Sequence, residues 1–165
     1  MPCKAEIYQL AAALSALLGG LILYLFARPA ESIYLFALFS YSHFPDYNLL
    51  GVFGQWLPSL VHTYAFILLT VITVGNGPRI IFISSLFWVG VSWIFELGQH
   101  PAISARLMKH IPPWFSEIPF LENSANYFQR GTFDPLDLFA TLIGAFAAWL
   151  TYQITRRRSH NDETE

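Results

Sequence analysis

Four long apolar runs constrain the fold of this chain more than any other feature. They occupy residues 7–26, 56–74, 80–98 and 136–154. At about 1.5 Å per residue, a helix over each run is roughly 30 Å long, which matches the hydrocarbon layer of a bilayer. The sequence therefore predicts an all-α fold, an integral membrane bundle of four transmembrane helices.

The composition favours membrane spans over an apolar soluble core. Hydrophobic residues make up 55% of the chain and charged residues only 12%, whereas a soluble domain carries about 25% charged residues. The net charge of −2 does not indicate a partner, but the chain has no basic stripe of the kind that nucleic acid requires, so we expect no nucleic-acid partner. Membrane lipid is the partner that the apolar runs predict. Cys3 is the only cysteine, which excludes an intrachain disulfide and a cysteine metal cluster.

The connections between the runs predict how the spans are arranged. Residues 75–79 read Gly-Asn-Gly-Pro-Arg, a tight turn that makes the second and third runs an antiparallel hairpin. The loops at 29–55 and 99–133 are long, aromatic and rich in proline, and Trp and Tyr prefer the headgroup level. We therefore predict interfacial helices in both outer loops. The chain is expected to be one domain over residues 1–155 with a short polar tail at 156–165.

One segment of the second long loop has helical periodicity. Apolar and basic residues alternate in it: Ile103, Leu107 and Ile111 with Arg106, Lys109 and His110 between them. This pattern predicts a short amphipathic helix that lies parallel to the bilayer.

The basic residues predict the orientation of the spans. The first run is expected to remain as a span rather than be cleaved as a signal peptide. Its apolar part is longer than the roughly 7–15 residues typical of a signal peptide, and no clear cleavage site precedes Glu31. Four spans place both termini on one side, together with Lys4, Arg79 and the arginines at 156–158. The positive-inside rule then predicts a multi-pass protein of the cell membrane with both termini in the cytoplasm.

This topology brings separated polar residues to the outer surface. His62 lies near the outer start of the second run, Glu96 near the outer end of the third, and Asp134 and Asp137 at the start of the fourth. A carboxylate at the centre of a span costs roughly 2.5–3.5 kcal/mol. Glu96 therefore marks either a functional site or a buried pair.

Structural interpretations remain open for each of these residues. The Asp-Pro-Leu-Asp segment at 134–137 is typical of a helix start, with an N-cap Asp, Pro at the first position and an acid that favours the helix dipole. Glu96 forms an ion pair with Arg130 in this interpretation, unless Arg130 contacts headgroup phosphates. His62 is then a core histidine and Gln99 a polar span end.

The same residues also suit chemistry at the outer surface. Glu96 beside Arg130 in a partly desolvated pocket is a candidate general base. His62 with two carboxylates matches the ligands of a divalent ion, but no HExxH-like spacing is present, so we predict no metal site. The sequence does not identify a cofactor.

Several of these residues are spaced as in a known family. The pattern resembles the VanZ-like membrane protein family through Glu96-x-x-Gln99, then Arg130, then Asp134-x-x-Asp137-x-x-x-Thr141-x-x-Gly144, with His62 and Tyr64 as its histidine–tyrosine element. The resemblance covers about half of the chain, residues 59–144. It implies a cell-envelope protein of four or five spans, with some relatives linked to glycopeptide-antibiotic resistance, and it implies no defined reaction.

Two functions follow from this sequence, and it leaves open whether the protein is an enzyme or an oligomer. The first is a VanZ-like envelope protein that binds or modifies a lipid-linked or cell-wall intermediate. Its candidate catalytic residues are Glu96, His62 and Asp137, and its candidate substrate-binding residues are Arg130, Gln99 and Asp134. The alternative is a non-catalytic membrane scaffold or assembly protein, in which the same residues form an ion pair and a helix cap.

Overall fold

The computed structural model describes residues 3–27, 53–119 and 121–162. Its four long helices are α1 (Lys4–Ala27), α3 (Phe53–Val74), α4 (Pro78–Gly98) and α7 (Pro135–Asp162). Each contains a segment that is long and apolar enough to cross a membrane. The described ranges contain no strand, so the predicted all-α class and its four candidate spans are confirmed.

The helices begin or end a few residues beyond the predicted runs. Helix α3 begins at Phe53, so Pro58 lies inside the helix rather than in its first turn. Helix α7 continues to Asp162, through most of the segment expected to be a polar tail. Apolarity marks only the part of a helix that suits lipid, whereas backbone hydrogen bonds continue through charged residues. Arginines near a helix C-terminus also interact favourably with its dipole.

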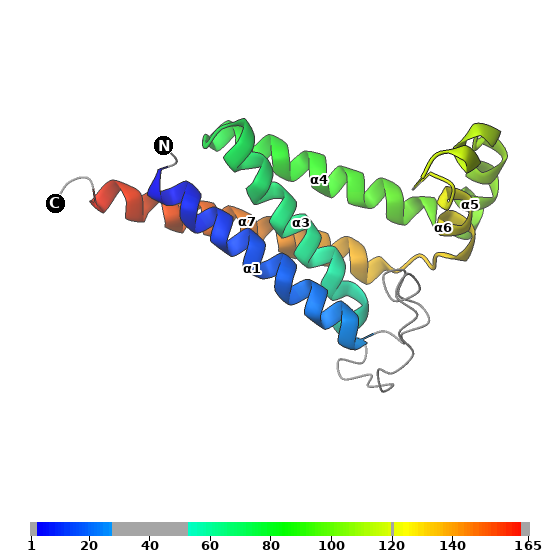
Figure 1. Cartoon of the computed structure of the whole chain (residues 1–165), viewed down its shortest axis with the longest axis horizontal. Helices are drawn as coiled ribbons and strands as arrows, with labels where there is room; N and C mark the ends of the chain where they lie inside the picture. Colours follow the sequence, from blue (N-terminus) through cyan, green and yellow to red (C-terminus); the bar gives the residue numbers. More distant parts are fainter. Residues whose placement is uncertain (1–2, 28–52, 120, 163–165) are drawn as a thin grey trace.

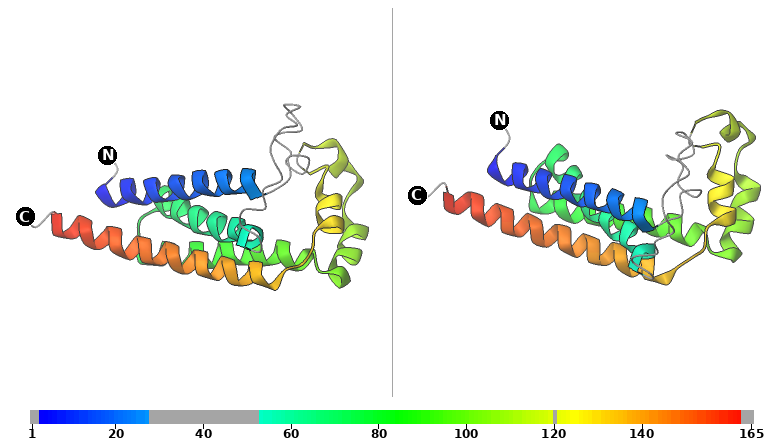
Figure 2. Two further views of the ribbon diagram at one scale, coloured as in Figure 1. Left: turned by 90° about the horizontal axis from the view of Figure 1, so that it is seen from below. Right: turned by 60° about the horizontal axis from the view of Figure 1, so that its bottom comes forward.

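The bundle is built around α3 and α7, which form its largest interface. Helices α1 and α4 each pack against both of them (Figure 1; Figure 2). Both chain termini lie at one end of the molecule with the α3–α4 turn, and we call this end the turn end. The opposite end, the cap end, carries the short helices between α4 and α7 (Figure 1).

The α3–α4 turn forms the predicted antiparallel hairpin. Gly75 adopts a φ of 147°, a conformation that favours glycine, and its N–H donates to the Val71 carbonyl at 3.1 Å. Gly77 is the N-cap of α4 and Pro78 is its first residue, the position at which a missing N–H costs nothing. Gly75 thus ends one helix and Pro78 begins the next.

Small residues and interhelical hydrogen bonds hold the bundle together. A Cβ on Gly144 of α7 would lie 2.5 Å from the Leu60 carbonyl oxygen of α3, so the two backbones touch at this crossing. The Tyr64 hydroxyl lies 3.1 Å from the Thr151 hydroxyl, and Trp93 donates to Thr141 at 3.0 Å. Close backbone approach and polar contacts of this kind are typical of helices that pack in lipid.

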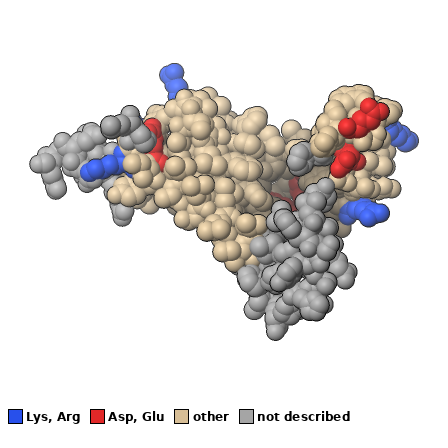
Figure 3. Space-filling view, in the orientation of Figure 1, with Lys and Arg blue, Asp and Glu red and all other residues tan. Residues whose placement is uncertain are grey.

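The outer faces of the helices are apolar. The most exposed large apolar side chains of α4 are Phe82, Ile83, Leu86, Phe87 and Ile94, and Ile94 is 72% exposed. On the face drawn in Figure 3, charged side chains gather at the two ends, and an uncharged belt lies between them. Soluble monomers rarely expose an apolar surface of this extent, which favours a lipid environment.

Candidate functional site

Glu96 joins the end of α4 to the start of α7. Its Oε1 accepts a hydrogen bond of 2.6 Å from the backbone N–H of Asp134, which immediately precedes α7. The two residues are 38 positions apart in the chain. Glu96 is only partly buried, and its hydrogen bond positions the start of α7.

Asp134 occupies the N-cap position that the sequence predicts. Its Oδ1 accepts from the Leu136 N–H at 2.9 Å, and its carbonyl accepts from the Asp137 N–H at 3.0 Å. Asp137 lies in the first turn of α7. The carboxylates of Asp134 and Asp137 are close enough to interact electrostatically with that of Glu96. We call these three residues the carboxylate cluster.

A small helical unit covers the end of α4 beside this cluster. It consists of α5 (Pro101–Leu107), the 3₁₀ turns η2 (Met108–His110) and η3 (Pro113–Glu117), and α6 (Ser124–Arg130), and we call it the cap. Gly98 allows the close approach, because a Cβ there would lie 2.6 Å from the Phe128 ring of α6 and 3.7 Å from Leu107. The cap is therefore packed against the same helix end that carries Glu96.

The predicted amphipathic helix is shorter than its pattern. Helix α5 ends at Leu107, η2 follows it, and Ile111 has an extended backbone. The apolar stripe therefore does not continue on one helix. Leu107 is partly buried near Gly98, whereas Ile103 is exposed. Leu107 packs on α4 instead of continuing an interfacial stripe. The two prolines at 112–113 also prevent the helix from extending past Ile111.

Gln99 and Tyr127 form the polar contact between α4 and the cap. Their side chains are hydrogen bonded to each other, and Tyr127 also interacts electrostatically with Glu96 and Asp137. Gly131 lies against Gln99, since a Cβ there would be 2.5 Å from the Gln99 amide carbon. These contacts bring Gln99 and Tyr127 into the neighbourhood of the carboxylate cluster.

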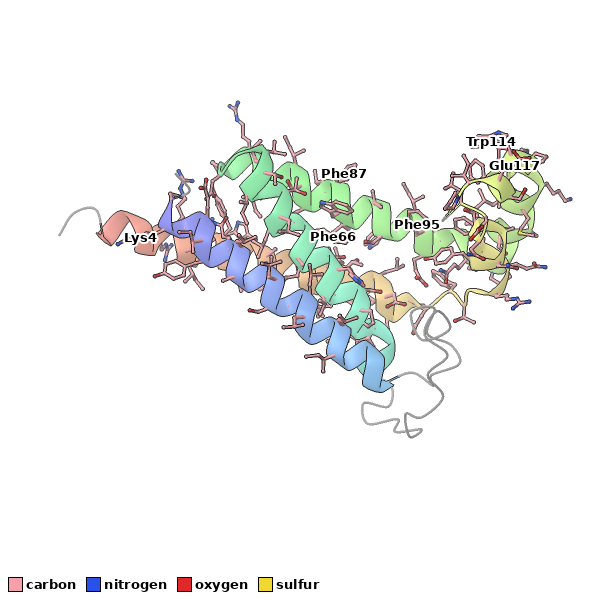
Figure 4. The ribbon with its side chains drawn as sticks, viewed as in Figure 1. Lys4, Phe66, Phe87, Phe95, Trp114 and Glu117 are labelled. Carbon is pink, nitrogen blue, oxygen red and sulfur yellow. The ribbon has the colours of Figure 1, made fainter. Side chains whose placement is uncertain are left out.

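Aromatic side chains surround this contact. The Phe95 ring lies 5.9 Å from the Tyr127 ring and 6.1 Å from the Phe128 ring, between centroids. Figure 4 shows Phe95 where α4 meets the cap, and Trp114 and Glu117 farther out on it. Tyr127 was not predicted as a site residue, because its contact with Gln99 depends on how the loop between α4 and α7 folds. The only sequence signal was the aromatic character of that loop.

His100 also was not identified from the sequence. Its Nδ1 accepts from the Ala102 N–H at 3.3 Å and so caps α5, and its ring lies 5.2 Å from the Phe133 ring. It therefore connects the start of the cap to the segment that leads into α7. A histidine followed by proline at a helix start is a recognisable capping signal in retrospect.

The structure does not bring all predicted site residues together. Arg130 is exposed at the end of α6, and among the described residues no ion pair connects it to Glu96. His62 is exposed on α3, where its ring contacts Phe66 with centroids 5.7 Å apart. It is therefore not a core histidine, and no hydrogen bond links it to the cluster within the described ranges.

The remaining motif residues pack the bundle. Thr141 is buried and accepts from Trp93, Tyr64 contacts Thr151, and Gly144 contacts α3. In the described part of the chain, no group of three or more His, Cys, Asp or Glu residues is arranged to hold a metal ion. The interfacial helix predicted within residues 29–55 falls largely on 28–52, outside the described residues.

Comparison with known proteins found no match. No protein-family model matches the chain, and no curated protein and no solved structure is significantly similar to it.

Tyr127 is expected to titrate above the ordinary tyrosine value. Burial raises the pKa of Tyr127 above 10.0, the bond with Gln99 opposes this, and the charges of Glu96 and Asp137 raise it further. Because the pKa of Tyr127 is higher in the folded state than in the unfolded state, protonated Tyr127 contributes to the free energy of unfolding. This contribution is complete below pH 10.0 and is lost as the pH rises through the folded pKa. The pKa of Tyr127 is measured from the phenolate absorbance of the wild type minus that of Tyr127→Phe, as a function of pH. A midpoint at or below 10.0 contradicts the packing described.

Proposed function

We propose that the chain is a VanZ-like integral membrane protein of the cell envelope. Its carboxylate cluster forms a polar site at the extracytoplasmic interface, and this site binds or modifies a lipid-linked or cell-wall intermediate. The observation that carries the proposal is the contact between Glu96 and the Asp134 N–H. It places an acid from the end of one candidate span against the start of another, next to the helical cap.

The distribution of basic residues supports an orientation in which the turn end is cytoplasmic and the cap end is outside. The turn end carries Lys4, Arg79, Arg156 and Arg157 beside both chain termini. The cap end carries the three carboxylates, and its basic residues, Arg106, Lys109 and Arg130, are spread along the longer connection between α4 and α7. Basic residues near span ends favour the cytoplasmic side, so we place both termini in the cytoplasm and the carboxylate cluster outside.

The cap is proposed to lie in the headgroup layer. Its exposed apolar side chains include Ile103 and Trp114, and Trp114 is 53% exposed. Arg106 and Lys109 are exposed on the same unit. Aromatic side chains and basic residues together suit the interface between lipid and water. In this position, the cap borders the site from which a lipid-linked ligand would enter.

The proposed ligand carries hydroxyl or amino groups as well as phosphate. Three carboxylates accept hydrogen bonds from hydroxyl and ammonium groups and repel a bare phosphate. Exposed Arg130, at the end of the cap, is the group that would bind a phosphate or a carboxylate. Glu96 would act as the acid or base if the ligand is modified. His62 is assigned no role, because no hydrogen bond among the described residues links it to the cluster and its ring contacts Phe66.

A scaffold function is the second candidate, and specific contacts favour it. The Glu96 carboxylate satisfies the Asp134 N–H, and the Asp134 carboxylate satisfies the Leu136 N–H. Both bonds fix the start of α7 and require no ligand. In this account, the cluster aligns α4, α7 and the cap for assembly with other components.

Two substitutions of Glu96 distinguish these functions. In Glu96→Gln the amide oxygen still accepts the Asp134 N–H but the charge is lost, whereas Glu96→Ala loses both. We expect Glu96→Gln to remain abundant in membranes and to bind a lipid-linked disaccharide-peptide precursor roughly tenfold more weakly, the effect of losing a charged hydrogen bond. Glu96→Ala should also destabilise the fold by about 1–3 kcal/mol, because it orphans that N–H.

Native mass spectrometry of the purified full chain measures the binding. Glu117→Gln, an exposed charge change on the cap, is the matched control and should bind like the wild type. A polyprenyl phosphate without sugar or peptide tests whether the polar groups matter. Wild-type binding by Glu96→Gln would refute the site and leave the scaffold function.

A further inference from the structure

A groove lies between α4 and α7 near the turn end, far from the carboxylate cluster. Its volume is about 370 Å³. Its lining is mainly apolar and includes Ile81, Phe82 and Ser85 of α4 and Ala145, Trp149 and Tyr152 of α7. The Ser85 hydroxyl donates to the Ile81 carbonyl of its own helix. Such a surface offers water few partners, so we expect an apolar occupant.

One arginine is held at this groove by a residue that lines it. Arg156 donates from Nη1 to the Tyr152 hydroxyl at 2.9 Å, and its guanidinium carbon lies 5.9 Å from the centre of the Tyr152 ring. Tyr152 itself is 1% exposed. The Arg156 side chain remains exposed, so its other N–H groups are available to a ligand. Its position is therefore coupled to the groove wall.

A second arginine stands at the same end of the groove. Arg79 follows Pro78, which also lines the groove, and its side chain is exposed on α4. The acids of this end among the described residues are Glu6 of α1, whose carboxylate accepts the Cys3 N–H at 2.9 Å, and Asp162, the last residue of α7. The groove thus combines an apolar trough with one arginine bound to its Tyr152 wall and a second that follows Pro78 at its edge.

We propose that this groove binds an anionic phospholipid. One acyl chain lies in the trough between α4 and α7, and the headgroup phosphate is bound by Arg79 and Arg156. The inference rests on the membrane location within the proposed function, but not on the carboxylate cluster or its ligand. Basic pockets between spans at a cytoplasmic surface are suited to acidic headgroups, and each basic residue contributes roughly fivefold in affinity.

The chemistry of the groove favours a lipid of net negative charge. A zwitterionic lipid fills the trough equally well but carries a cationic group that two arginines repel. A soluble phosphate contacts the arginines but gains nothing from the apolar wall. Only an anionic phospholipid satisfies both parts of the surface.

The test compares lipids on the purified full chain. Native mass spectrometry and thermal shift are measured with phosphatidylglycerol, phosphatidylcholine and inorganic phosphate. We expect retention and stabilisation by phosphatidylglycerol, weaker effects of phosphatidylcholine, and none of phosphate. Arg79→Gln should weaken phosphatidylglycerol binding roughly fivefold and leave phosphatidylcholine unchanged. Arg106→Gln, which removes an exposed arginine from the cap, is the charge-matched control and should change neither.

A second variant tests the trough. Ser85 is partly buried on α4, so Ser85→Leu narrows the groove and should weaken the binding of both lipids. Equal affinity for the two lipids in the wild type, or no effect of Arg79→Gln, would overturn the proposal. A chain that alkaline carbonate washes out of membranes would instead refute the membrane location, and with it the proposed function.

Discussion

Gly144→Leu is expected to prevent the bundle from assembling. Gly144 lies where α7 crosses α3, and a Cβ there would be 2.5 Å from the Leu60 carbonyl oxygen and 3.3 Å from the Tyr64 nitrogen. Both neighbours are backbone atoms, so no side-chain rotation relieves the clash. Overpacking usually costs about 1–3 kcal/mol and occasionally more. At the largest interface of the bundle, we expect a loss of about 3 kcal/mol or more.

Gly90→Leu is the matched control for this substitution. A Cβ on Gly90 of α4 meets no atom within 4 Å, so leucine there projects into open space. Size-exclusion chromatography and thermal unfolding in detergent compare the two variants with the wild type. Gly144→Leu should aggregate or unfold at a much lower temperature, while Gly90→Leu should not. Equal stability of the two would contradict the described α3–α7 crossing.

Tyr152→Ala is expected to have the second largest effect. Tyr152 is almost fully buried on α7, in the core that includes Ala65, Leu68 and Val71 of α3. Truncation of a buried aromatic side chain leaves a cavity and costs about 3–5 kcal/mol. The variant also releases Arg156, whose guanidinium donates to the Tyr152 hydroxyl. Stability and preference for anionic lipid should therefore both decrease.

Tyr152→Phe separates these two effects. It keeps the ring in the core but removes the hydroxyl that accepts from Arg156. We expect a small change in the free energy of unfolding, about 1 kcal/mol, the value of one ordinary hydrogen bond. Thermal unfolding without phosphatidylglycerol measures the stability of the variant, and the shift on adding phosphatidylglycerol measures its response to anionic lipid. A loss of stability in Tyr152→Phe as large as in Tyr152→Ala would mean that the hydrogen bond, rather than packing, stabilises this position.

The spans and their connection were predictable because they depend on local sequence. Apolar length identified the four helices, and the Gly-Asn-Gly-Pro turn identified the hairpin. The N-cap at Asp134 followed from the residues next to it. In each case, the chemistry of adjacent residues decides the structure, so a single sequence contains the information.

Contacts across the bundle were harder to predict. The depth of Glu96 in its helix placed it near Asp134, but not as an acceptor for the Asp134 backbone, because helix rotation cannot be read from one sequence. His62 was predicted at the same depth as Glu96, but its described ring contact is with Phe66 of its own helix. The Tyr127–Gln99 contact depends on how the cap folds, and the apolar pattern did not reveal this because it continues to Ile111 although α5 ends at Leu107.

Site-specific cysteine labelling of intact cells tests most directly whether the helices span a membrane with the carboxylate cluster outside. Cys3 is exposed at the turn end and is the chain's only cysteine, and Thr132→Cys in a Cys3→Ser background places one beside the cluster. With a membrane-impermeant maleimide, we expect Thr132→Cys to be labelled in intact cells and Cys3 only after the membrane is opened. Labelling of Cys3 but not of position 132 in intact cells would reverse the orientation. Equal labelling of both would contradict the spanning bundle itself.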